Sequence, residues 1–251
     1  MSPPKPTTTI LVAISGPSCS GKTTLARLLR DALTPHAFIL HEDDFYLPDS
    51  QIPLVRTADG RELADWDCLE SINVRALEDM LAHIRTTGSL KSGFDSQEDQ
   101  NELGTVDIDE AAIADVKKRL KGAVKDGVRI AIVDGFLLFA EGMRGVRDKF
   151  DVRLLLTAEY MVIKRRREAR KGYVTLDGFW EDPEGYVDAV VWPNYVKDHK
   201  FLYKGGDIDR GVDEEKCREL GIFSAPVEVR ENMTKCFIWA GNVLIDRLKA
   251  L

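Results

Sequence analysis

Eight residues near the start of the chain have the spacing of a phosphate-binding loop. The segment Gly16-Pro-Ser-Cys-Ser-Gly-Lys-Thr23 fits G-x-x-x-x-G-K-[ST] at every fixed position. In this pattern the glycines let backbone N–H groups face phosphate oxygens, the lysine reaches the β- and γ-phosphates, and the last hydroxyl ligates Mg²⁺. We therefore expect an ATP site whose residues are Gly16, Ser18, Ser20, Gly21, Lys22, Thr23 and Thr24.

Acidic residues at the ends of two predicted strands could complete a phosphoryl-transfer site. Asp43 and Asp44 follow the strand predicted at 37–41, and the carboxyl ends of parallel strands open into the ligand crevice. Asp43 is the better candidate for activating a substrate hydroxyl, and a solvated loop or a helix cap is the alternative. Asp134 ends an apolar strand and precedes Gly135, as does an acid that positions Mg²⁺. Turn chemistry is the alternative there.

A basic run stands out in a chain whose net charge is −7. It reads Lys164-Arg-Arg-Arg-Glu-Ala-Arg-Lys171, and at helical spacing Arg166 and Arg170 share one face while Arg167 lies on a neighbouring one. We expect a lid that neutralises charge on the transferring phosphoryl group and excludes water. A nuclear-import patch or a solvated helix face are the alternatives.

The apolar pattern predicts an α/β protein with the P-loop NTPase fold. Buried parallel strands are expected at 8–15, 37–41, 129–134 and 151–157, with helices at 24–33 and from about 232 to the end. Such alternation predicts a central parallel sheet with helices on both faces. We expect one domain over 1–251, with a small lid at 164–185 and polar insertions or mobile loops at 48–64, 86–107 and 204–221.

The composition disfavours several classes of binding partner. A net charge of −7 disfavours binding of nucleic acid or an anionic membrane over a broad surface. No apolar run is long enough to cross a bilayer, so we expect a cytoplasmic protein, with the nucleus as a second compartment because of the basic run. The four cysteines and four histidines are scattered without metal-ligand spacing. We therefore expect no zinc, and we assign no histidine to catalysis.

Together these motifs resemble the nicotinamide riboside kinases, within the uridine kinase-like group of P-loop kinases. The resemblance leaves out the three insertions, and the segments that carry it are 14–24, 41–46, 65–67, 133–139, 164–167 with Arg170 and Tyr173, and 191–195.

The resemblance implies a role for each polar residue. Asp43 would contact the acceptor 5′-hydroxyl and the Mg²⁺ region, so that Thr23, Asp43 and Asp134 are the candidate metal ligands. Lys22, Asp43 and Asp134 would be the catalytic residues. Asp67 and Arg167 would hold the ribose diol, and Arg166 and Arg170 would be lid arginines that contact ATP.

The resemblance also implies that Trp66 and Tyr173 sandwich a pyridinium ring. Alone, each aromatic residue is more typical of core packing. In some members of the family tyrosine matches Trp66 and glutamate matches Asp134, which preserves an aromatic face and an acid. A pyridinium carries a fixed positive charge, which electron-rich ring faces favour. The implied reaction converts ATP and nicotinamide riboside to ADP and nicotinamide mononucleotide, a step of NAD biosynthesis.

Two other functions stay open at this stage. A uridine-cytidine kinase would share the core, but its neutral base would need hydrogen-bonding groups in place of the aromatic pair. A GTPase-type switch is the more distant alternative. Asp182-Pro-Glu-Gly185 matches D-x-x-G, yet it follows no apolar strand and the chain has no Asn-Lys-x-Asp. The oligomeric state is not indicated by the sequence.

Overall fold

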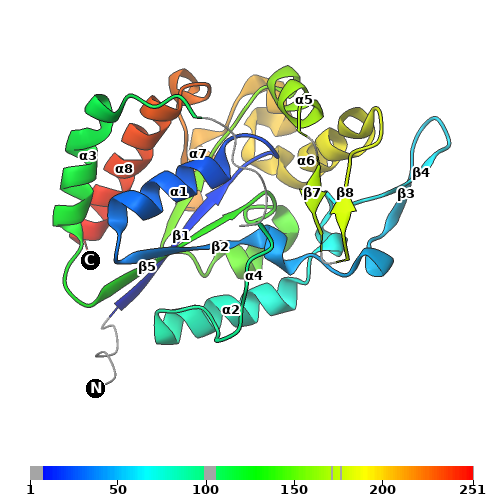
Figure 1. Ribbon diagram of the computed structural model, residues 1–251. Coiled ribbons are helices and arrows are strands. Elements are labelled where there is room, and N and C mark those ends of the chain that lie inside the picture. Colours follow the sequence, from blue (N-terminus) through cyan, green and yellow to red (C-terminus); the bar gives the residue numbers. More distant parts are fainter. Residues whose placement is uncertain (1–7, 99–105, 171, 176, 251) are drawn as a thin grey trace.

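A five-stranded parallel sheet forms the centre of the computed structural model, which describes residues 8–98, 106–170, 172–175 and 177–250 (Figure 1). The strand order is β2-β5-β1-β6-β9, and every neighbouring pair is parallel. All four predicted strands are present, and a fifth is added near the C-terminus. The strands are β1 (Thr8–Ser15), β2 (Ala37–His41), β5 (Val128–Gly135), β6 (Val152–Leu155) and β9 (Ile222–Ser224).

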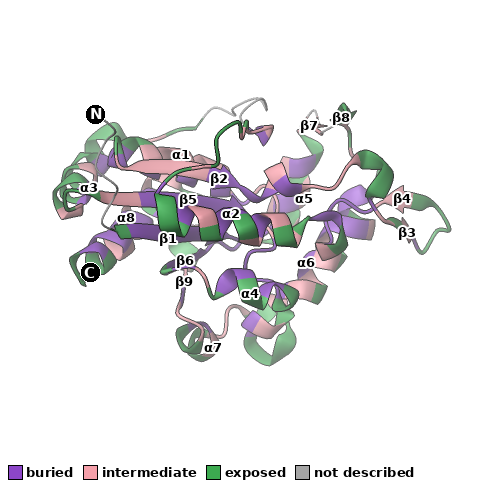
Figure 2. Ribbon diagram, turned by 90° about the horizontal axis from the view of Figure 1, so that it is seen from below, coloured by how far each residue is buried: buried purple, intermediate pink, exposed green. Residues whose placement is uncertain are grey.

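Both faces of the sheet are buried under helices, as predicted. Along β1, Ile10, Val12 and Ile14 join one apolar cluster, while Leu11 and Ala13 join the cluster on the opposite face. The first face is covered by α1 (Lys22–Leu33), α3 (Glu110–Ala123) and α8 (Met233–Ala250). The second is covered by α2 (Val74–Thr87), α4 (Arg144–Arg147), α6 (Trp192–His199) and α7 (Glu214–Glu219). Figure 2 shows buried strands behind a helix α2 whose outer face is exposed.

Short polar side chains mark where the covering helices begin. The side chain of Asn73 accepts a hydrogen bond from the backbone N–H of Ala76 at the start of α2, and Asp109 does the same for Ala112 at the start of α3. Gly88 ends α2 at a φ of 70°, and its N–H donates to the carbonyl of Ile84. The lengths of these helices are therefore specified locally.

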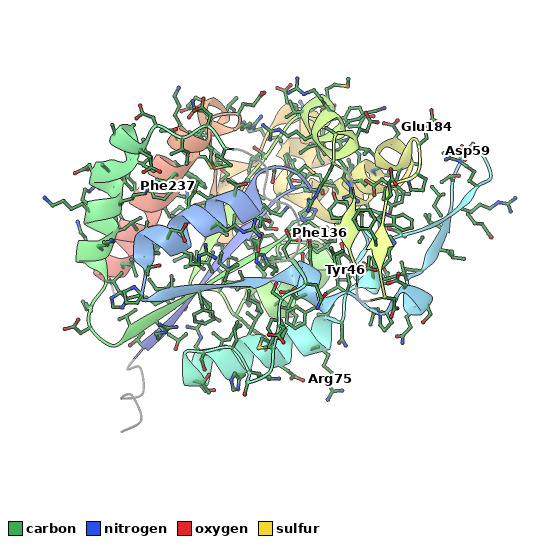
Figure 3. All side chains as sticks on the ribbon, in the orientation of Figure 1. Tyr46, Asp59, Arg75, Phe136, Glu184 and Phe237 are labelled. Atoms are coloured by element: carbon green, nitrogen blue, oxygen red, sulfur yellow. The ribbon has the colours of Figure 1, made fainter. Side chains whose placement is uncertain are left out.

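Two antiparallel hairpins lie beyond the sheet. The insertion at 48–64, expected as a loop, instead contains β3 (Leu54–Arg56) paired with β4 (Glu62–Ala64). The tip of this hairpin lies next to residue 184, where Arg61 Nη1 donates to the Glu184 carbonyl at 2.9 Å; Figure 3 labels Asp59 and Glu184 there. The predicted lid comprises the end of α5 (Tyr160–Glu168) and a hairpin of β7 (Tyr173–Val174) and β8 (Phe179–Trp180).

The other two predicted insertions lie at 86–107 and 204–221. Residues 99–105 of the predicted 86–107 insertion lie outside the described residues, whereas 86–98 and 106–107 are described. The stretch at 204–221 contains the short helix α7. No helix of the described part of the chain is long and apolar enough to cross a membrane.

The packing of α8 on the sheet yields a stability prediction. Leu244 is 1 % exposed within the first apolar cluster, so Leu244→Ala removes buried methyl groups and leaves a cavity. We expect a loss of about 2–5 kcal/mol in the free energy of unfolding, measured by denaturant titration. Asp246→Ala, at an exposed position of the same helix, is the control and should change it by less than about 0.5 kcal/mol. Equal losses in the two variants would contradict this view of the core.

Candidate active site

The phosphate-binding loop connects β1 to α1, as the motif requires. Gly16 has a φ of 148°, and a Cβ there would lie 2.2 Å from the carbonyl oxygen of Leu156, so only glycine fits. Gly21 has a φ of 96° and stands directly before α1, whose N-terminal N–H groups face the loop. The Nζ of Lys22 donates to the carbonyl of Pro17 at 2.9 Å. This hydrogen bond links the two ends of the phosphate-binding loop.

Asp134, at the end of β5, is bonded to two neighbouring segments. The hydroxyl of Thr23 donates to its Oδ2 at 2.5 Å, and His41 Nδ1 lies 2.5 Å from its Oδ1. Burial disfavours a charged imidazole, but the carboxylates of Asp134, Asp44 and Glu98, with Asp134 contributing most, together outweigh this effect and raise the pKa of His41 to about 9. The site therefore contains a buried histidine–carboxylate pair. We assigned no histidine to the site from the sequence, and His41 is a residue that was missed.

Two further carboxyl groups lie on the turn after β2. Burial, reinforced by Glu98 and Asp134, raises the pKa of Asp43 to about 7, where a carboxylate is a competent base near neutral pH. Glu42 is fully buried, and its Oε2 accepts from the backbone N–H of Leu137 at 3.0 Å. Gly135 makes this packing possible, because a Cβ there would lie 2.4 Å from the same oxygen. Sequence reasoning missed Glu42.

Asp44, the weaker candidate for activating a substrate hydroxyl, is hydrogen-bonded to the 86–107 insertion. Its Oδ1 accepts three hydrogen bonds from one segment, namely from Ser96 Oγ at 2.9 Å, from the N–H of Gln97 at 2.8 Å and from the N–H of Glu98 at 3.2 Å. These bonds hold the first part of the 86–107 insertion against the turn that carries Asp43.

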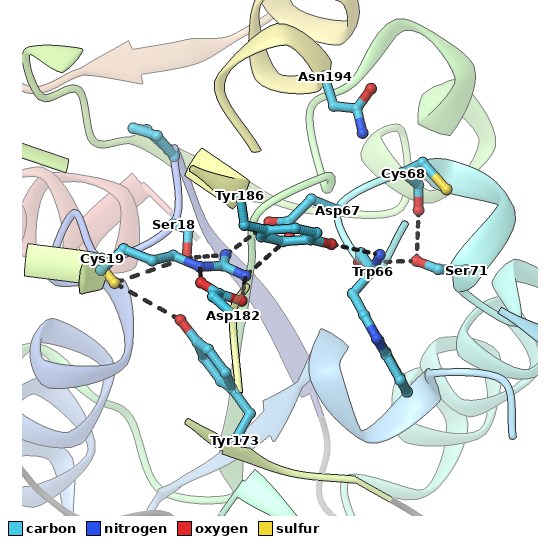
Figure 4. A network of polar contacts seen from close by, with 12 residues as sticks. Ser18, Cys19, Trp66, Asp67, Cys68, Ser71, Tyr173, Asp182, Tyr186 and Asn194 are labelled. Atoms are coloured by element: carbon cyan, nitrogen blue, oxygen red, sulfur yellow. Dashed lines mark hydrogen bonds and ion pairs between the residues drawn. The ribbon is translucent and has the colours of Figure 1, made fainter. Parts of the chain in front are cut away.

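Arg167 forms ion pairs with two carboxylates, those of Asp67 and Asp182, and Figure 4 labels both partners together with Ser18. Its guanidinium forms a fork with Asp67 at 2.8 and 2.9 Å and a second with Asp182 at 2.6 and 3.1 Å. Its Nη1 also donates to Ser18 Oγ of the phosphate loop at 2.9 Å. The structure therefore brings together the two residues expected at a ribose diol, and it adds Asp182, which we had weighed only as part of a GTPase-like motif.

Trp66 belongs to a group of four aromatic side chains that are in contact with one another. The indole is 6 % exposed and contacts Tyr46 edge-on, with ring centroids 5.3 Å apart, and Trp180 at 5.7 Å. Tyr46 also stacks on Phe136 at 6.3 Å, and Figure 3 labels both of these residues. Tyr46, Trp180 and Phe136 were not expected at the site, although the first and third lie within motifs noted in the sequence. We call Tyr46, Trp66, Phe136 and Trp180 the aromatic wall.

The lid arginines do not share a helix face. Helix α5 ends at Glu168, so the i, i+4 spacing of Arg166 and Arg170 is not helical throughout, and that expectation was wrong. Arg166 Nη1 donates to the carbonyl of Cys19 at 3.3 Å. The Arg170 guanidinium lies 4.0 Å from the ring centroid of Tyr173, and that of Arg167 lies 4.9 Å from the same centroid. In this structure Tyr173 is thus a platform for two guanidinium groups.

One cavity of about 230 Å³ is lined by most of the residues singled out in the sequence. Of the predicted site residues, all but Gly16, Ser20 and Arg166 line it. Ser20 and Arg166 line a neighbouring cavity of about 70 Å³ on the side of β9 and α8. The phosphate loop, the candidate base and the aromatic wall therefore meet in a single space.

Known proteins with similar sequences share one description. No protein-family model matches the chain. A nicotinamide riboside kinase of Schizosaccharomyces pombe is 36% identical over 243 residues, which cover 96% of this chain and 98% of that protein. The nicotinamide riboside kinase of Saccharomyces cerevisiae is 35% identical over 85% of this chain and 87% of its own length. Nicotinamide riboside kinase 1 of Homo sapiens is 29% identical over 75% and 76%.

Among solved structures, one described as a fructose transport system kinase of Silicibacter sp. TM1040 aligns over 65% of this chain and 72% of its own, at 21% identity and a TM-score of 0.40. The family of this chain is shown by its sequence relatives alone. With more than a third of its residues identical over nearly its whole length to the first of these kinases, the chain belongs to the nicotinamide riboside kinase family.

Proposed function

We propose that this protein transfers the γ-phosphoryl group of ATP to the 5′-hydroxyl of nicotinamide riboside, which gives ADP and nicotinamide mononucleotide. The observation that carries the proposal is the shared cavity, in which a phosphate loop, a carboxyl group and an aromatic wall line the same space. The names of the relatives support the same acceptor. The aromatic wall suits a cationic ring better than a neutral pyrimidine edge, which needs hydrogen-bonding partners.

ATP would bind with its phosphates on the loop and its nucleoside end in the cavity of about 70 Å³. The N-terminus of α1 and Lys22 supply positive charge to the phosphates. Three buried polar atoms without a hydrogen-bond partner belong to residues that line the smaller cavity: Ser20 Oγ, Thr157 Oγ1 and Arg230 Nε. Because buried polar groups usually have partners, these atoms support a polar ligand at this place.

Thr23, Asp43 and Asp134 would hold Mg²⁺. Their donor atoms are a hydroxyl and carboxylate oxygens, the ligands that Mg²⁺ prefers, and Thr23 Oγ1 and Asp134 Oδ2 already lie 2.5 Å apart. Within the described residues no group of three or more His, Cys, Asp or Glu side chains forms a ready metal site. Mg²⁺ keeps several waters and needs few protein ligands, so Thr23, Asp43 and Asp134 would be enough to hold it. When bound, the ion neutralises charge on the β- and γ-phosphates.

Each side chain then has a defined task. Asp43 accepts the proton of the 5′-hydroxyl. His41 is paired with Asp134 and holds the Asp134 carboxylate in a fixed orientation. The fork of Arg167 and Asp67 presents polar groups to the ribose diol, and the aromatic wall lies against the pyridinium ring. Arg166 and Arg170 neutralise charge that develops on the phosphoryl group.

The acceptor is tested by product masses. The protein is incubated with ATP, Mg²⁺ and one riboside at a time, namely nicotinamide riboside, nicotinic acid riboside, uridine or cytidine. We expect the mass of nicotinamide mononucleotide as the main product. Phosphorylation of uridine without phosphorylation of nicotinamide riboside would replace this proposal by a pyrimidine nucleoside kinase.

Replacement of the base gives a second prediction. Asp43→Asn keeps the size of the side chain but cannot accept the proton, so kcat should fall by about 10²–10⁴-fold. The affinity for ATP, measured by calorimetry, should remain within a few-fold. Asp126→Asn, which alters an exposed carboxylate outside the cavity, is the control and should leave turnover unchanged. A collapse of ATP affinity with intact turnover would show that Asp43 has another role.

Replacement of Trp66 tests the recognition of charge. Since a cation over an aromatic face contributes about 0.5–2 kcal/mol and stacking adds to it, Trp66→Leu should lower kcat/KM for nicotinamide riboside about tenfold. A neutral riboside should lose less, because only the stacking is removed. Trp239→Leu on α8 is the matched control, with melting temperatures to verify folding. Equal losses for both acceptors would mean that the indole does not sense charge.

A further inference from the structure

A carboxylate from the 86–107 insertion lies among the site residues, and apart from its charge near Asp43 it has no task in the reaction described so far. Glu98 is 7 % exposed and lines the cavity of about 230 Å³. Its backbone N–H is fixed by Asp44, and the same segment is anchored by Phe94, which stacks on Phe45 with ring centroids 5.8 Å apart. Glu98 is therefore placed on the wall that carries Asp43 and is held there by the chain around it.

Across the cavity Glu98 contacts the lid. Its Oε1 lies 4.0 Å from Nη2 of Arg170, and the Arg170 guanidinium lies 4.0 Å from the ring centroid of Tyr173. The Arg170 guanidinium is thus in contact with both the Glu98 carboxylate and the Tyr173 ring. Arg170 is 31 % exposed and lies past the end of α5, so the ordered part of that helix does not fix its side chain. The guanidinium is free to exchange this pair of contacts for another anion.

We propose that Glu98 is a positioning residue for Arg170. Glu98 holds the Arg170 guanidinium over the Tyr173 ring until the cationic ring of the acceptor takes that place. The inference rests on the proposed function, in which Arg170 neutralises the transferring phosphoryl group and the acceptor carries a positively charged ring. While Arg170 is bound to Glu98 and Tyr173, the γ-phosphate of ATP lacks one of its two lid arginines. Entry of the pyridinium ring next to the Tyr173 ring displaces the guanidinium toward the phosphates.

The exchange has a chemical purpose. Water enters an open kinase site and can accept the phosphoryl group, so a lid arginine that acts before the acceptor is bound promotes loss of ATP. A charge pair that competes with the phosphate suppresses this side reaction. Because the pair is partly exposed, its contribution is small, and the expected effects are a few-fold.

The test is ATP hydrolysis without any riboside, in wild-type protein and in Glu98→Gln. The glutamine keeps the shape of the side chain but removes the charge that competes for Arg170. We expect acceptor-independent ATP hydrolysis to rise, and the KM for ATP to fall, each by about two- to fivefold. Glu98→Asp, which keeps the charge, should restore most of the wild-type behaviour. Asp95→Asn removes a charge at an exposed position of the same segment and should change neither quantity.

A double-mutant comparison links the effect to its partner. In an Arg170→Met background, Glu98→Gln should no longer raise hydrolysis or lower the KM for ATP. Unchanged values in Glu98→Gln, or the same change with and without Arg170, would overturn the inference. Should Glu98→Gln melt too early to be assayed, Glu98→Met, which has a similar length and no charge, takes its place; hydrolysis above the wild-type level is expected, and an unchanged level would contradict the inference.

The outcome is separable from the proposed function. The readout uses ATP and no acceptor, so it is independent of which riboside is phosphorylated. Absence of nicotinamide mononucleotide among the products would refute the proposed acceptor, whereas its presence together with silent Glu98 variants would refute only the role of Glu98.

Discussion

The carboxylate of Asp134 joins three segments that are distant in the sequence. The parallel register places Asp134 opposite Ile14 on β1 and opposite His41 on β2, so the ends of three strands meet at one point. A buried carboxylate without partners is costly, and here it is stabilised by the Thr23 hydroxyl and the His41 ring. The phosphate loop, the second strand and the site acid therefore fix one another. The turn that carries Asp43 follows β2 directly, and the loop that binds Glu42 follows β5 directly, so both are positioned by this contact.

The sheet could be predicted from the sequence because each of its long strands has a continuous apolar run at its centre. β1 and β5 are buried on both faces, so their composition differs clearly from that of the flanking loops. The hairpin of β3 and β4 was missed for the opposite reason. Its strands have three residues each and are largely exposed, so neither alternation nor an apolar run distinguishes them from a loop.

The site residues also fall into those that could be predicted from the sequence and those that could not. The phosphate loop is a contiguous motif, so its residues could be named in advance, and the resemblance to a family supplied the aromatic and acidic pair at 66 and 67. His41 was missed because its partner Asp134 is 93 positions away, and nothing near His41 in the sequence indicates a charged pair. Asp182 was missed similarly, since only the folded lid brings it to Arg167. Long-range ion pairs are properties of the tertiary structure, which local patterns do not encode.

The phosphate loop and the acceptor wall belong to different kinds of structure, and this separation has an evolutionary consequence. The groups that face the phosphates are attached to strand ends, where a change in register would disturb the whole sheet. Trp66 follows strand β4 and Trp180 ends strand β8, so both lie outside the central sheet, in peripheral segments of the kind that tolerate changes in length. Descendants of such a kinase can diverge in the base they accept through substitutions in these segments, while the machinery for transferring phosphate is inherited intact.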